Sequence, residues 1–452
     1  MRMTSRWVAV LVGLALTLAA DISNAGSAMQ ELLETLHENG TIDDVTFEQL
    51  TSAVAAQPDG QPQTGEREPT QHAAKVTSND GLFEFTSEDG DTRFVVGGRL
   101  QIEAAGYDSD EVDMGNGTGL RRARVTLAGT INDVWHYKTQ FDFATGNIAI
   151  TRAFISYTGL PVAIVLGQFK EPIGLQTLTF ARYNTFIERA LQAAFFPGPN
   201  IGLKLHKGGE RYSATVGVFG ERFNDNNEAE DPITDDSNDQ DEGVGVTGRL
   251  TWAPFGGGKR VLHLGVAASH RELNDSERVR YRSRPESHIT GVRLVDTGAI
   301  TGVKSRDLYG FEAAGVVGPW SAQAEYMASS LDRRSRGDLD FSGWYVQTGL
   351  FLTGESRNYN PSSGVFKRLA PANPVSSGGF GAWQIAARLS NLDLTDESVD
   401  GGEERNLTLG VNWFLEPTLR LSFNYVEVLD VDGGADAGHE PSVYQMSAYV
   451  DF

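Results

Sequence analysis

Four basic residues in the first third of the chain alternate with apolar neighbours: they are Arg99, Arg122, Arg124 and Lys138. Successive side chains of a strand point to opposite faces, so each cation lies opposite an apolar face. Guanidinium groups present forked donors that suit phosphate and carboxylate oxygens. The spacing therefore predicts a basic surface for small anions. Acidic neighbours such as Glu103 and Asp142 leave a purely structural ion-pair ladder as the alternative.

A second basic series is formed by Arg278, Arg280, Arg282 and Arg284. Their spacing of two places all four on one side of an extended chain, where they form a ladder that leads anions toward a narrower site. The alternative is a solvated outer loop, or one that contacts lipopolysaccharide phosphates. Arg121 departs from the alternation of its neighbours, so we expect it at a strand end or in a loop.

Other chemistry is sparse in the sequence. It contains no His-Glu-x-x-His zinc motif, no Gly-x-Ser-x-Gly nucleophile motif and no P-loop. His136, His206 and His263 have no evident serine and acid partners. Residues 225–242 are rich in Asp and Asn, but their spacing lacks the regularity of a calcium loop and favours a solvated acidic loop. We therefore expect neither an enzyme nor a resident metal or cofactor.

The bulk composition limits the class of protein. The chain has 452 residues, no cysteine, 51 glycines and a net charge of −22, with a mean hydropathy of −0.29. The negative charge argues against nucleic-acid binding, which needs a basic footprint. It still permits a local basic channel, because a pore samples only the side chains that line it. A helical membrane protein would be far more apolar, whereas a transmembrane barrel conceals its apolar face in alternation.

The first 81 residues differ from the rest. Residues 1–25 have a basic start, an apolar stretch too short to span a bilayer and small residues before Gly26, which predict a signal peptide. In residues 26–81 we expect two short helices, around Leu32–Leu36 and Val45–Val54, followed by a polar linker. This segment forms a periplasmic arm without chemistry, or a small oligomerisation or cell-wall contact.

Residues 82–452 repeat one pattern, in which segments of about ten residues alternate apolar and polar side chains. Leu407, Leu409 and Val411 share one face, for instance, while Thr408 lies on the other. Short connections such as Gly318-Pro319 alternate with long polar ones, which are Asp108–Leu120, Asn224–Glu242, Arg271–Arg306, Glu355–Gly381 and Asp430–Pro441. A soluble sandwich has no reason to separate loop lengths in this way. The pattern predicts a transmembrane antiparallel β-barrel of about 16 strands.

The final strand is the clearest single signal. Apolar or aromatic residues occupy every second position from Tyr444 to Phe452, and Gln445, Ser447 and Asp451 lie on the other face. A terminal aromatic residue in such a strand resembles the signal that the barrel assembly machinery reads. We therefore expect that machinery as a partner, and the lipid and lipopolysaccharide of a Gram-negative outer membrane as the surroundings.

The barrel decides on which side the cations lie. An arginine or lysine that faces lipid near the middle of the bilayer costs about 2–4 kcal/mol, whereas one that faces a water-filled lumen costs little. Arg99, Arg122 and Arg124 are therefore expected to line the lumen. Confined arginines raise the local concentration of anions and favour their passage.

The chain resembles the phosphate-selective porins O and P. The matching stretches are Val96–Gln101, Arg121–Arg124, Trp135–Asp142, Gly167–Lys170, Gly174-Leu175, Ile187–Arg189, Ala253-Pro254, Val261–Gly265, Ser321–Tyr326, Leu352–Glu355 and Leu409–Trp413. Each stretch alone is weak evidence for the resemblance. Their shared order along nearly all of the chain after Leu82 makes the resemblance specific.

The resemblance implies a homotrimer in which each barrel has its own anion pore. It implies that a loop at about Glu171–Asn200 folds inward and narrows this pore. The family's constriction arginines, from its Gly-Gly-Arg strand and its Arg-Arg pair, correspond to Arg99, Arg121 and Arg122. The family's arginine ladder in a long outer loop corresponds to three of the four residues Arg278, Arg280, Arg282 and Arg284.

Four positions depart from the phosphate-specific members of this family. Thr177 stands where they carry a lysine and Thr151 where they carry an aspartate, whereas Arg124 and Lys170 replace tyrosines. An anion pore survives these changes because two cations are gained. Inorganic phosphate as the preferred ion does not follow.

We expect a passive outer-membrane channel for small inorganic anions, with phosphate or polyphosphate as candidates. Its constriction is formed by Arg99, Arg122 and Arg124, with Arg121, Lys138 and Lys170 nearby. A weakly selective or organic-anion porin of the same family stays open as an alternative. A structural or adhesive outer-membrane barrel, with a plugged lumen, is the alternative from a different class.

Overall fold

The computed structural model describes residues 75–79, 82–109, 112–144, 146–222, 233–235, 242–274 and 277–452, together with Phe47 and Thr51. Apart from Phe47 and Thr51, the expected signal peptide, the two helices expected in residues 26–81 and most of the acidic loop 225–242 lie outside the described residues. Within the described part, no helix is both long enough and apolar enough to cross a membrane.

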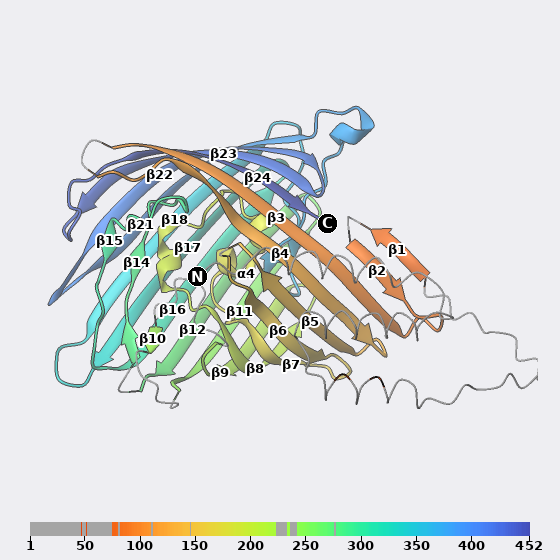
Figure 1. Cartoon of the computed structure of the whole chain (residues 1–452), viewed down its shortest axis with the longest axis horizontal. Coiled ribbons are helices and arrows are strands. Elements are labelled where there is room, and N and C mark those ends of the chain that lie inside the picture. Colours follow the sequence, from red (N-terminus) through yellow and green to blue (C-terminus); the bar gives the residue numbers. More distant parts are fainter. Residues whose placement is uncertain are drawn as a thin grey trace, which may run out of the picture. The chain divides into compact units, whose positions relative to one another are not determined.

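Sixteen antiparallel strands form one closed barrel, which confirms the all-β barrel predicted from the alternation (Figure 1). Each strand pairs with the next along the chain, and β24 pairs back with β3 to close the barrel, with Ser442 opposite Asp108. The strands are β3 (Thr92–Asp108), β4 (Gly117–Ile131), β5 (Trp135–Asp142), β6 (Ala149–Tyr157), β7 (Ala163–Lys170), β8 (Pro199–Gly208), β9 (Tyr212–Phe219), β11 (Val244–Gly257), β12 (Arg260–Glu272), β16 (Val303–Val317), β17 (Trp320–Arg333), β18 (Leu339–Phe351), β21 (Ala382–Asp396), β22 (Val399–Glu416), β23 (Leu419–Asp432) and β24 (Ser442–Asp451).

The outer face of the barrel is apolar. On β22, Leu409 is exposed on this face, whereas Thr408 points inward and is buried. Trp383 and Trp413 stack on the same face with ring centroids 5.0 Å apart. An apolar outer band with aromatic rings suits a barrel surrounded by lipid.

A hairpin of β1 (Lys75–Asn79) and β2 (Leu82–Thr86) precedes the barrel. It continues the sheet beyond the end of β24, because β2 pairs with the first part of β3. Phe85 of the hairpin lies against Phe94 of β3 with ring centroids 6.1 Å apart. Residues 75–79 therefore form a strand, where the sequence analysis expects a polar linker.

The C-terminal residue completes the ladder between β24 and β3. The Phe452 amide donates to the Gly98 carbonyl at 3.0 Å. The Phe452 ring covers Gly98, and a side chain at position 98 would collide with this ring. Glycine in β3 thus makes room for the terminal aromatic residue.

The two ends of the barrel differ less in loop length than expected. We call the end with Phe452 and the short turns at 132–134 and 318–319 the turn end, and the opposite end the loop end. Outer-membrane barrels place their short turns on the periplasmic side. The long connection 352–381 lies at the turn end, because β18 runs toward that end. The expectation that Glu355–Gly381 belongs with the long outer loops is therefore wrong.

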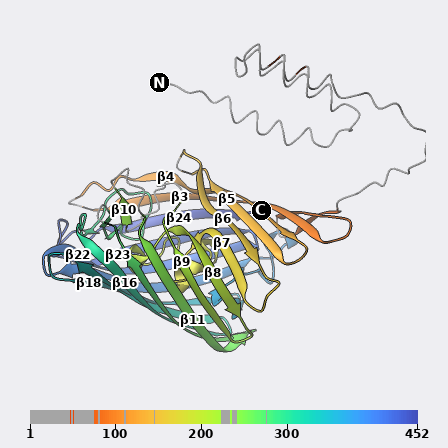
Figure 2. The same ribbon diagram turned by 90° about the horizontal axis from the view of Figure 1, so that it is seen from below.

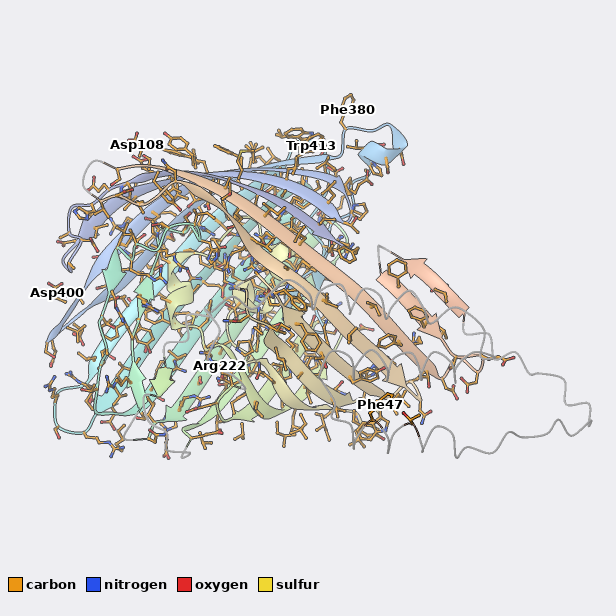
Figure 3. The ribbon with its side chains drawn as sticks, in the orientation of Figure 1. Phe47, Asp108, Arg222, Phe380, Asp400 and Trp413 are labelled. Atoms are coloured by element: carbon orange, nitrogen blue, oxygen red, sulfur yellow. The ribbon has the colours of Figure 1, made fainter. Side chains whose placement is uncertain are left out.

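Figure 3 shows this placement. Asp400, at the start of β22, and Phe380, in the 352–381 connection, lie at opposite ends of the barrel. Figure 2 gives the view from below, in which β7, β8, β9 and β11 form the near wall. The turn end therefore carries one long segment as well as the short turns.

Three connections fold into the lumen, and each is named here by its residue numbers. The 171–198 segment contains α4 (Leu175–Leu178), η2 (Ala181–Tyr183) and η3 (Leu191–Phe195). The 273–302 segment contains β13 (Glu277–Val279), which pairs with β10 (Ile233–Asp235), and the pair β14 (Arg282–Ser283) and β15 (Val295–Asp296). The 352–381 segment enters from the turn end and contains β19 (Tyr359–Asn360), β20 (Val365–Phe366) and η4 (Val375–Ser377).

Apolar clusters fill the lumen where these segments meet the wall. Phe195 and Tyr281, from two different segments, pack against each other and against Phe341 of β18. Phe366 of the 352–381 segment packs against Leu175 of α4. The open part of the lumen is therefore displaced toward the opposite wall, formed by β3 to β7.

Candidate functional site

A cavity of about 560 Å³ lies between the inner wall of β3 to β7 and the folded 171–198 and 273–302 segments. Among its described lining residues, three are acidic, namely Asp142, Glu188 and Glu286. Ten are basic, namely Arg99, Arg121, Arg122, Arg124, Arg152, Lys170, Arg189, Arg222, Arg282 and Arg284. We call this space the basic cavity.

A β-bulge places two adjacent arginines on the same wall of the basic cavity. Gln101 of β3 pairs with Arg122, but the next residue, Ile102, pairs with Leu120, so Arg121 is the extra residue. A bulge re-aims a side chain that simple alternation would direct to the other face. The expectation that Arg121 lies at a strand end or in a loop is wrong, because it lies within β4 and lines the cavity.

A second bulge lies on β6, two strands along the same wall. Gln140 of β5 pairs with Arg152, and Phe141 pairs with Ile150, so Thr151 is the extra residue. Thr151 and Arg152 both line the basic cavity. Thr151 also donates to the Gln140 side chain at 3.0 Å, which keeps its hydroxyl against the wall.

Two of the cavity arginines have a carboxylate partner. Arg121 and Glu188 form a forked pair, with 2.6 Å from Nε to Oε1 and 3.2 Å from Nη2 to Oε2. Arg124 donates from Nε to Asp142, whose carboxylate also accepts the Ala123 amide at 3.1 Å. Much of the positive charge of these two arginines is therefore offset within the protein.

Four other cavity cations differ from Arg121 and Arg124. In the part of the chain that the structure describes, Arg99, Arg152, Arg189 and Arg282 form no ion pair. The Nε atoms of Arg99 and Arg189 are buried without any hydrogen-bond acceptor. Buried donors are normally satisfied, and these two Nε atoms have no acceptor among the described residues.

Two further cations are held by neutral groups. Arg122 donates from Nη1 to the Gln101 side-chain oxygen at 2.6 Å. The Lys170 ammonium donates to the main-chain carbonyl of Thr177. Neutral partners fix the position of a side chain without supplying a negative charge, so no carboxylate is needed to hold Arg122 and Lys170 against the cavity.

The aromatic ring of Phe180 gathers cations at the edge of the cavity. The guanidinium carbons of Arg152 and Arg182 lie 5.0 and 5.2 Å from its ring centroid, and the Lys138 ammonium lies 5.7 Å from it. The face of an aromatic ring attracts cations. Phe180 thus holds positive groups close together without adding a negative charge.

The 171–198 segment crosses the lumen and is fixed to the far wall, as the resemblance implies. Asn412 of β22 donates to the Thr185 carbonyl at 2.8 Å, and Arg420 of β23 donates to the Asn184 carbonyl at 2.7 Å. Gly174 begins the crossing with a φ of 79°, and a side chain there would collide with the Phe196 ring. This tight, left-handed turn requires glycine.

Two titratable groups of the inward segments that face the arginines, Glu188 and His288, have shifted pKa values. Burial raises the pKa of Glu188, but the guanidiniums of Arg121 and Arg122 lower it more, so the pKa lies well below its usual range. Burial and the nearby charge of Arg121 lower the pKa of His288 to about 3. At neutral pH the cavity therefore contains a Glu188 carboxylate and a neutral His288 imidazole.

Seven of the ten predicted site residues line the basic cavity; they are Arg99, Arg121, Arg122, Arg124, Lys170, Arg282 and Arg284. Lys138 lies beside it, against Phe180. Arg280 instead forms an exposed pair with Asp296 at 2.5 Å. Arg278 is exposed on β13 and does not line the cavity. The ladder of four arginines is thus divided, because only its last two members reach the cavity.

The sequence analysis missed three cavity cations, which are Arg152, Arg189 and Arg222. Arg152 was detectable, because the outward-facing Ile155 puts it on the inner face of β6. Arg189 and Arg222 belong to connections, whose side-chain directions follow no period. Figure 3 shows Arg222 within the outline of the barrel.

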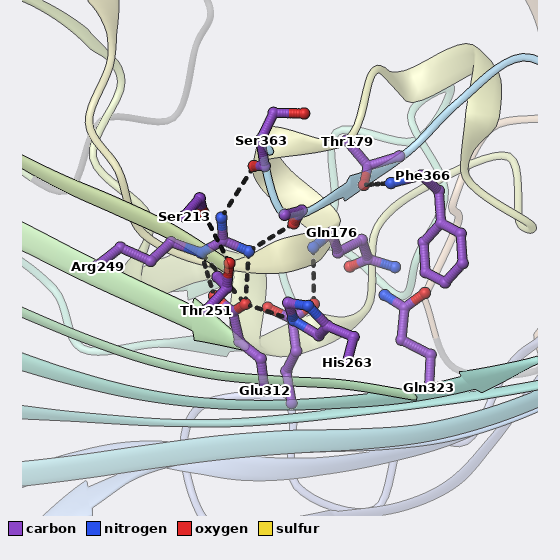
Figure 4. A network of polar contacts seen from close by, with 12 residues as sticks. Gln176, Thr179, Ser213, Arg249, Thr251, His263, Glu312, Gln323, Ser363 and Phe366 are labelled. Atoms are coloured by element: carbon purple, nitrogen blue, oxygen red, sulfur yellow. Dashed lines mark hydrogen bonds and ion pairs between the residues drawn. The ribbon is translucent and has the colours of Figure 1, made fainter. Parts of the chain in front are cut away.

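The opposite part of the lumen holds buried arginines in a different way (Figure 4). Arg249 of β11 forms a forked pair with Glu312 of β16, at 2.9 and 2.6 Å, and donates to the Gly364 carbonyl at 2.8 Å. His263 bridges Glu312 and Tyr359, at 3.1 and 2.6 Å. His263 therefore has an acidic partner that the sequence did not reveal. The network attaches the 352–381 segment to the wall.

The side chains of the basic cavity are suited to attract and position anions. Among the described residues, no group of His, Asp and Glu is arranged to hold a metal ion. Unpaired guanidiniums in a confined, water-accessible space lower the electrostatic barrier for an anion. No covalent step is needed for such a site to act.

Comparison with known proteins places the chain in one family. A family model described as phosphate-selective porin O and P matches residues 94–452. The chain is 29% identical to Porin O of Pseudomonas aeruginosa over 395 residues, covering 79% of this chain and 88% of that protein. It is 30% identical over 375 residues to an uncharacterized protein of Caulobacter vibrioides, covering 81% of this chain and 74% of that one.

Solved structures agree on the architecture. The anion-selective porin from Comamonas acidovorans superposes with a TM-score of 0.50 at 13% identity, covering 80% of this chain and all of that one. At this identity the likeness concerns the barrel fold alone. The family match extends over most of the barrel, from β3 to the C-terminal residue. The chain therefore belongs to the phosphate-selective porin O and P family and is an outer-membrane β-barrel porin.

Proposed function

We propose that this porin is a passive channel for small anions and that the basic cavity is its selective constriction. The observation that carries the proposal is the excess of cations in the cavity, ten basic against three acidic lining residues. Arg99, Arg152 and Arg189 contribute most, because none of them forms an ion pair with a carboxylate in the described part of the chain. Arg282 and Arg284 lead anions inward from the loop end.

The surroundings follow from the family and from the barrel surface. We propose that the chain is exported by the signal peptide expected in residues 1–25 and assembled through its C-terminal strand. It acts as a homotrimer in the outer membrane, as the family resemblance implies, in contact with lipid and lipopolysaccharide. Residues 26–81 form a periplasmic arm in this proposal, and residues 82–452 the porin itself.

A second candidate substrate class is favoured by the apolar side of the cavity. Phe180, Phe196 and Pro197 line it from the 171–198 segment. Such a wall tolerates the carbon skeleton of an organic anion, whose acidic groups would meet the guanidiniums opposite. Thr177 supplies no cation where phosphate-specific members carry lysine, but the Lys170 ammonium reaches the Thr177 carbonyl. Phosphate therefore stays a candidate beside organic anions.

Ion selectivity in planar bilayers tests the proposal directly. Under a KCl gradient, the purified porin should give a reversal potential that favours chloride over potassium. The Arg99→Ala/Arg152→Ala double variant should lower the chloride preference roughly fivefold, because two unpaired charges leave the constriction. Arg280→Ala is the matched control, since Arg280 pairs with Asp296 away from the cavity. A wild-type preference for potassium would refute the anion channel.

Competition experiments separate the two substrate classes. Chloride current is measured with increasing phosphate or with a dicarboxylate on one side of the membrane. Block of the chloride current by phosphate at a lower concentration than the dicarboxylate needs supports inorganic phosphate as the preferred ion. Block by the dicarboxylate alone supports the organic-anion channel.

A further inference from the structure

The carboxylate of Glu286 is an acidic group at the edge of a basic cavity. Glu286 lies at the tip of the 273–302 segment, is only 4% exposed and is one of the lining residues. An exposed carboxylate at this position would repel the anions that the pore admits. Its surroundings therefore bear on the selectivity of the channel.

Four side chains of the barrel wall hold Glu286. Its Oε2 accepts hydrogen bonds from Arg388 of β21 and Thr408 of β22. Its Oε1 accepts one from Ser390 at 2.6 Å, and its main-chain oxygen accepts one from the Gln445 amide group at 2.9 Å. The carboxylate is thus turned to the wall and fully satisfied, away from the pore.

The backbone at Glu286 is bent to allow this contact. Its φ of 50° is in the left-handed region, which residues other than glycine rarely adopt. Such a conformation persists where surrounding contacts over-determine it. Further contacts come from Tyr107 of β3, whose hydroxyl lies 2.6 Å from the Ser287 hydroxyl and accepts the Thr290 amide at 2.8 Å.

Arg388 joins this tip to the other inward segment. Its Nη2 contacts Glu286, while its Nη1 donates to the main-chain carbonyl of Glu188 at 3.1 Å. Its guanidinium also lies over the Phe186 ring, 4.4 Å from the centroid. Arg388 and Glu286 are both almost completely buried as a pair. One side chain of the wall therefore fixes the 171–198 and 273–302 segments together.

We propose that Arg388 is a positioning residue that determines the selectivity of the channel. It masks the Glu286 carboxylate, and it holds the 273–302 segment so that Arg282 and Arg284 face the basic cavity. The proposal rests on anion passage through this cavity. Without Arg388, Glu286 would be a buried charge without a counter-ion, which is strongly unfavourable. The tip would leave the wall and place a negative charge in the pore.

Three variants test this role: Arg388→Met, Glu286→Gln and the double variant. Arg388→Met should lower the chloride-to-potassium permeability ratio about threefold or more, because it releases a charged group into the pore. Glu286→Gln should raise the ratio by a smaller factor, since it only removes the masked charge. The double variant should return to near the wild-type ratio. All three should show greater open-channel current noise, because the tip has lost its ionic anchor.

The control is Arg405→Met, which removes an exposed arginine of β22 whose partner is Glu403, at 3.3 Å. Its selectivity and noise should match the wild type. Heat-modified mobility on gels checks that each variant forms a barrel. If Arg388→Met does not fold, Arg388→Lys replaces it. Lysine keeps the positive charge but loses the two-pronged guanidinium that contacts both inward segments. The open-channel current noise should therefore rise while the preference for chloride is retained.

Several outcomes would overturn the role of Arg388. One is an unchanged chloride-to-potassium permeability ratio in Arg388→Met. Another is a fall of this ratio in Arg388→Met that equals its rise in Glu286→Gln, without any increase in open-channel current noise. The third is a loss of anion selectivity in Arg388→Lys. These outcomes are distinct from a failure of the anion channel itself, which the wild-type reversal potential reveals on its own.

Discussion

Along β3 to β7 the lumen arginines border an open cavity, whereas along β11, β12 and β21 they lie sealed beneath inward segments. Three arginines of the sealed half have a carboxylate: Arg249 has Glu312, Arg271 has Glu171 and Arg388 has Glu286. In the open half Arg99, Arg152 and Arg189 have none within the described residues. The same residue type thus fastens segments in one half and, in the function we propose, lowers the barrier for anions in the other.

The physical reason for this difference is hydration. A buried charge without a counter-ion costs much more than an ion pair, so a carboxylate stabilises an arginine that has lost its water. Arginines beside a water-accessible cavity keep part of their hydration and tolerate each other. The partner, rather than the arginine itself, therefore distinguishes a structural cation from a functional one. Each of the following variants changes one partner or one charge to test this distinction.

The largest expected effect is on stability, in the sealed half. Arg249→Met should lower the free energy of unfolding by about 3–5 kcal/mol, because it leaves the buried Glu312 carboxylate without its cation. Arg99→Met should lower it much less, since no carboxylate among the described residues loses its counter-ion. Urea unfolding of the barrel in lipid vesicles measures both. An equal loss of unfolding free energy in both variants would mean that the arginines of the two halves do not differ in their dependence on a carboxylate partner.

An intermediate effect is expected when a cavity arginine loses its partner. Asp142→Asn should raise the chloride-to-potassium permeability ratio about twofold, because the charge of Arg124 is no longer offset. Asp133→Asn is the control, since Asp133 pairs with Arg93 on the exposed turn between β4 and β5, at 3.0 Å. Reversal potentials under a KCl gradient measure the ratio. A fall in the ratio in Asp142→Asn would show that Asp142 mainly positions Arg124.

The smallest effect is expected from pH. With an ordinary pKa near 6.5, His288 would gain a positive charge as the pH falls from 7 to 5, and chloride conductance would rise. Because its pKa is lowered to about 3, the imidazole stays neutral in this range. Glu188 stays ionised, since its pKa lies below the usual range. Neither group should therefore add a step in conductance between pH 4.5 and 6.5.

Single-channel conductance at several pH values measures this, with His288→Gln as the comparison. Wild type and variant should give parallel pH profiles. A rise in conductance below pH 6 that disappears in His288→Gln would show that His288 titrates in the open pore.

Much of the barrel was predictable because its surroundings impose a simple rule. Lipid outside and water or packed polar groups inside force a period of two on every strand, as in β24 from Tyr444 to Phe452. The inward direction of Arg99, Arg122 and Arg124 followed from the same rule. It failed at Arg121, because a bulge in β4 adds one residue that no local pattern indicates.

The connections were less predictable. The length of 352–381 suggested an outer loop, yet the direction of β18 puts it at the turn end, where it enters the lumen. Arg189 reaches the cavity only because Gly174 and the contacts of Asn184 and Thr185 bring its segment across the barrel. Such placements depend on contacts between residues far apart in the sequence.

The sequence by itself determined the barrel, its apolar outer face and a set of lumen cations, because alternation is a local property of each strand. The tertiary structure alone decided which cations have carboxylate partners. Arg121 and Arg124 are paired, Arg99 and Arg152 have no carboxylate partner among the described residues, and Glu286 is turned to Arg388. Charge pairing depends on which strands and inward segments lie side by side, and only the closed barrel fixes that arrangement.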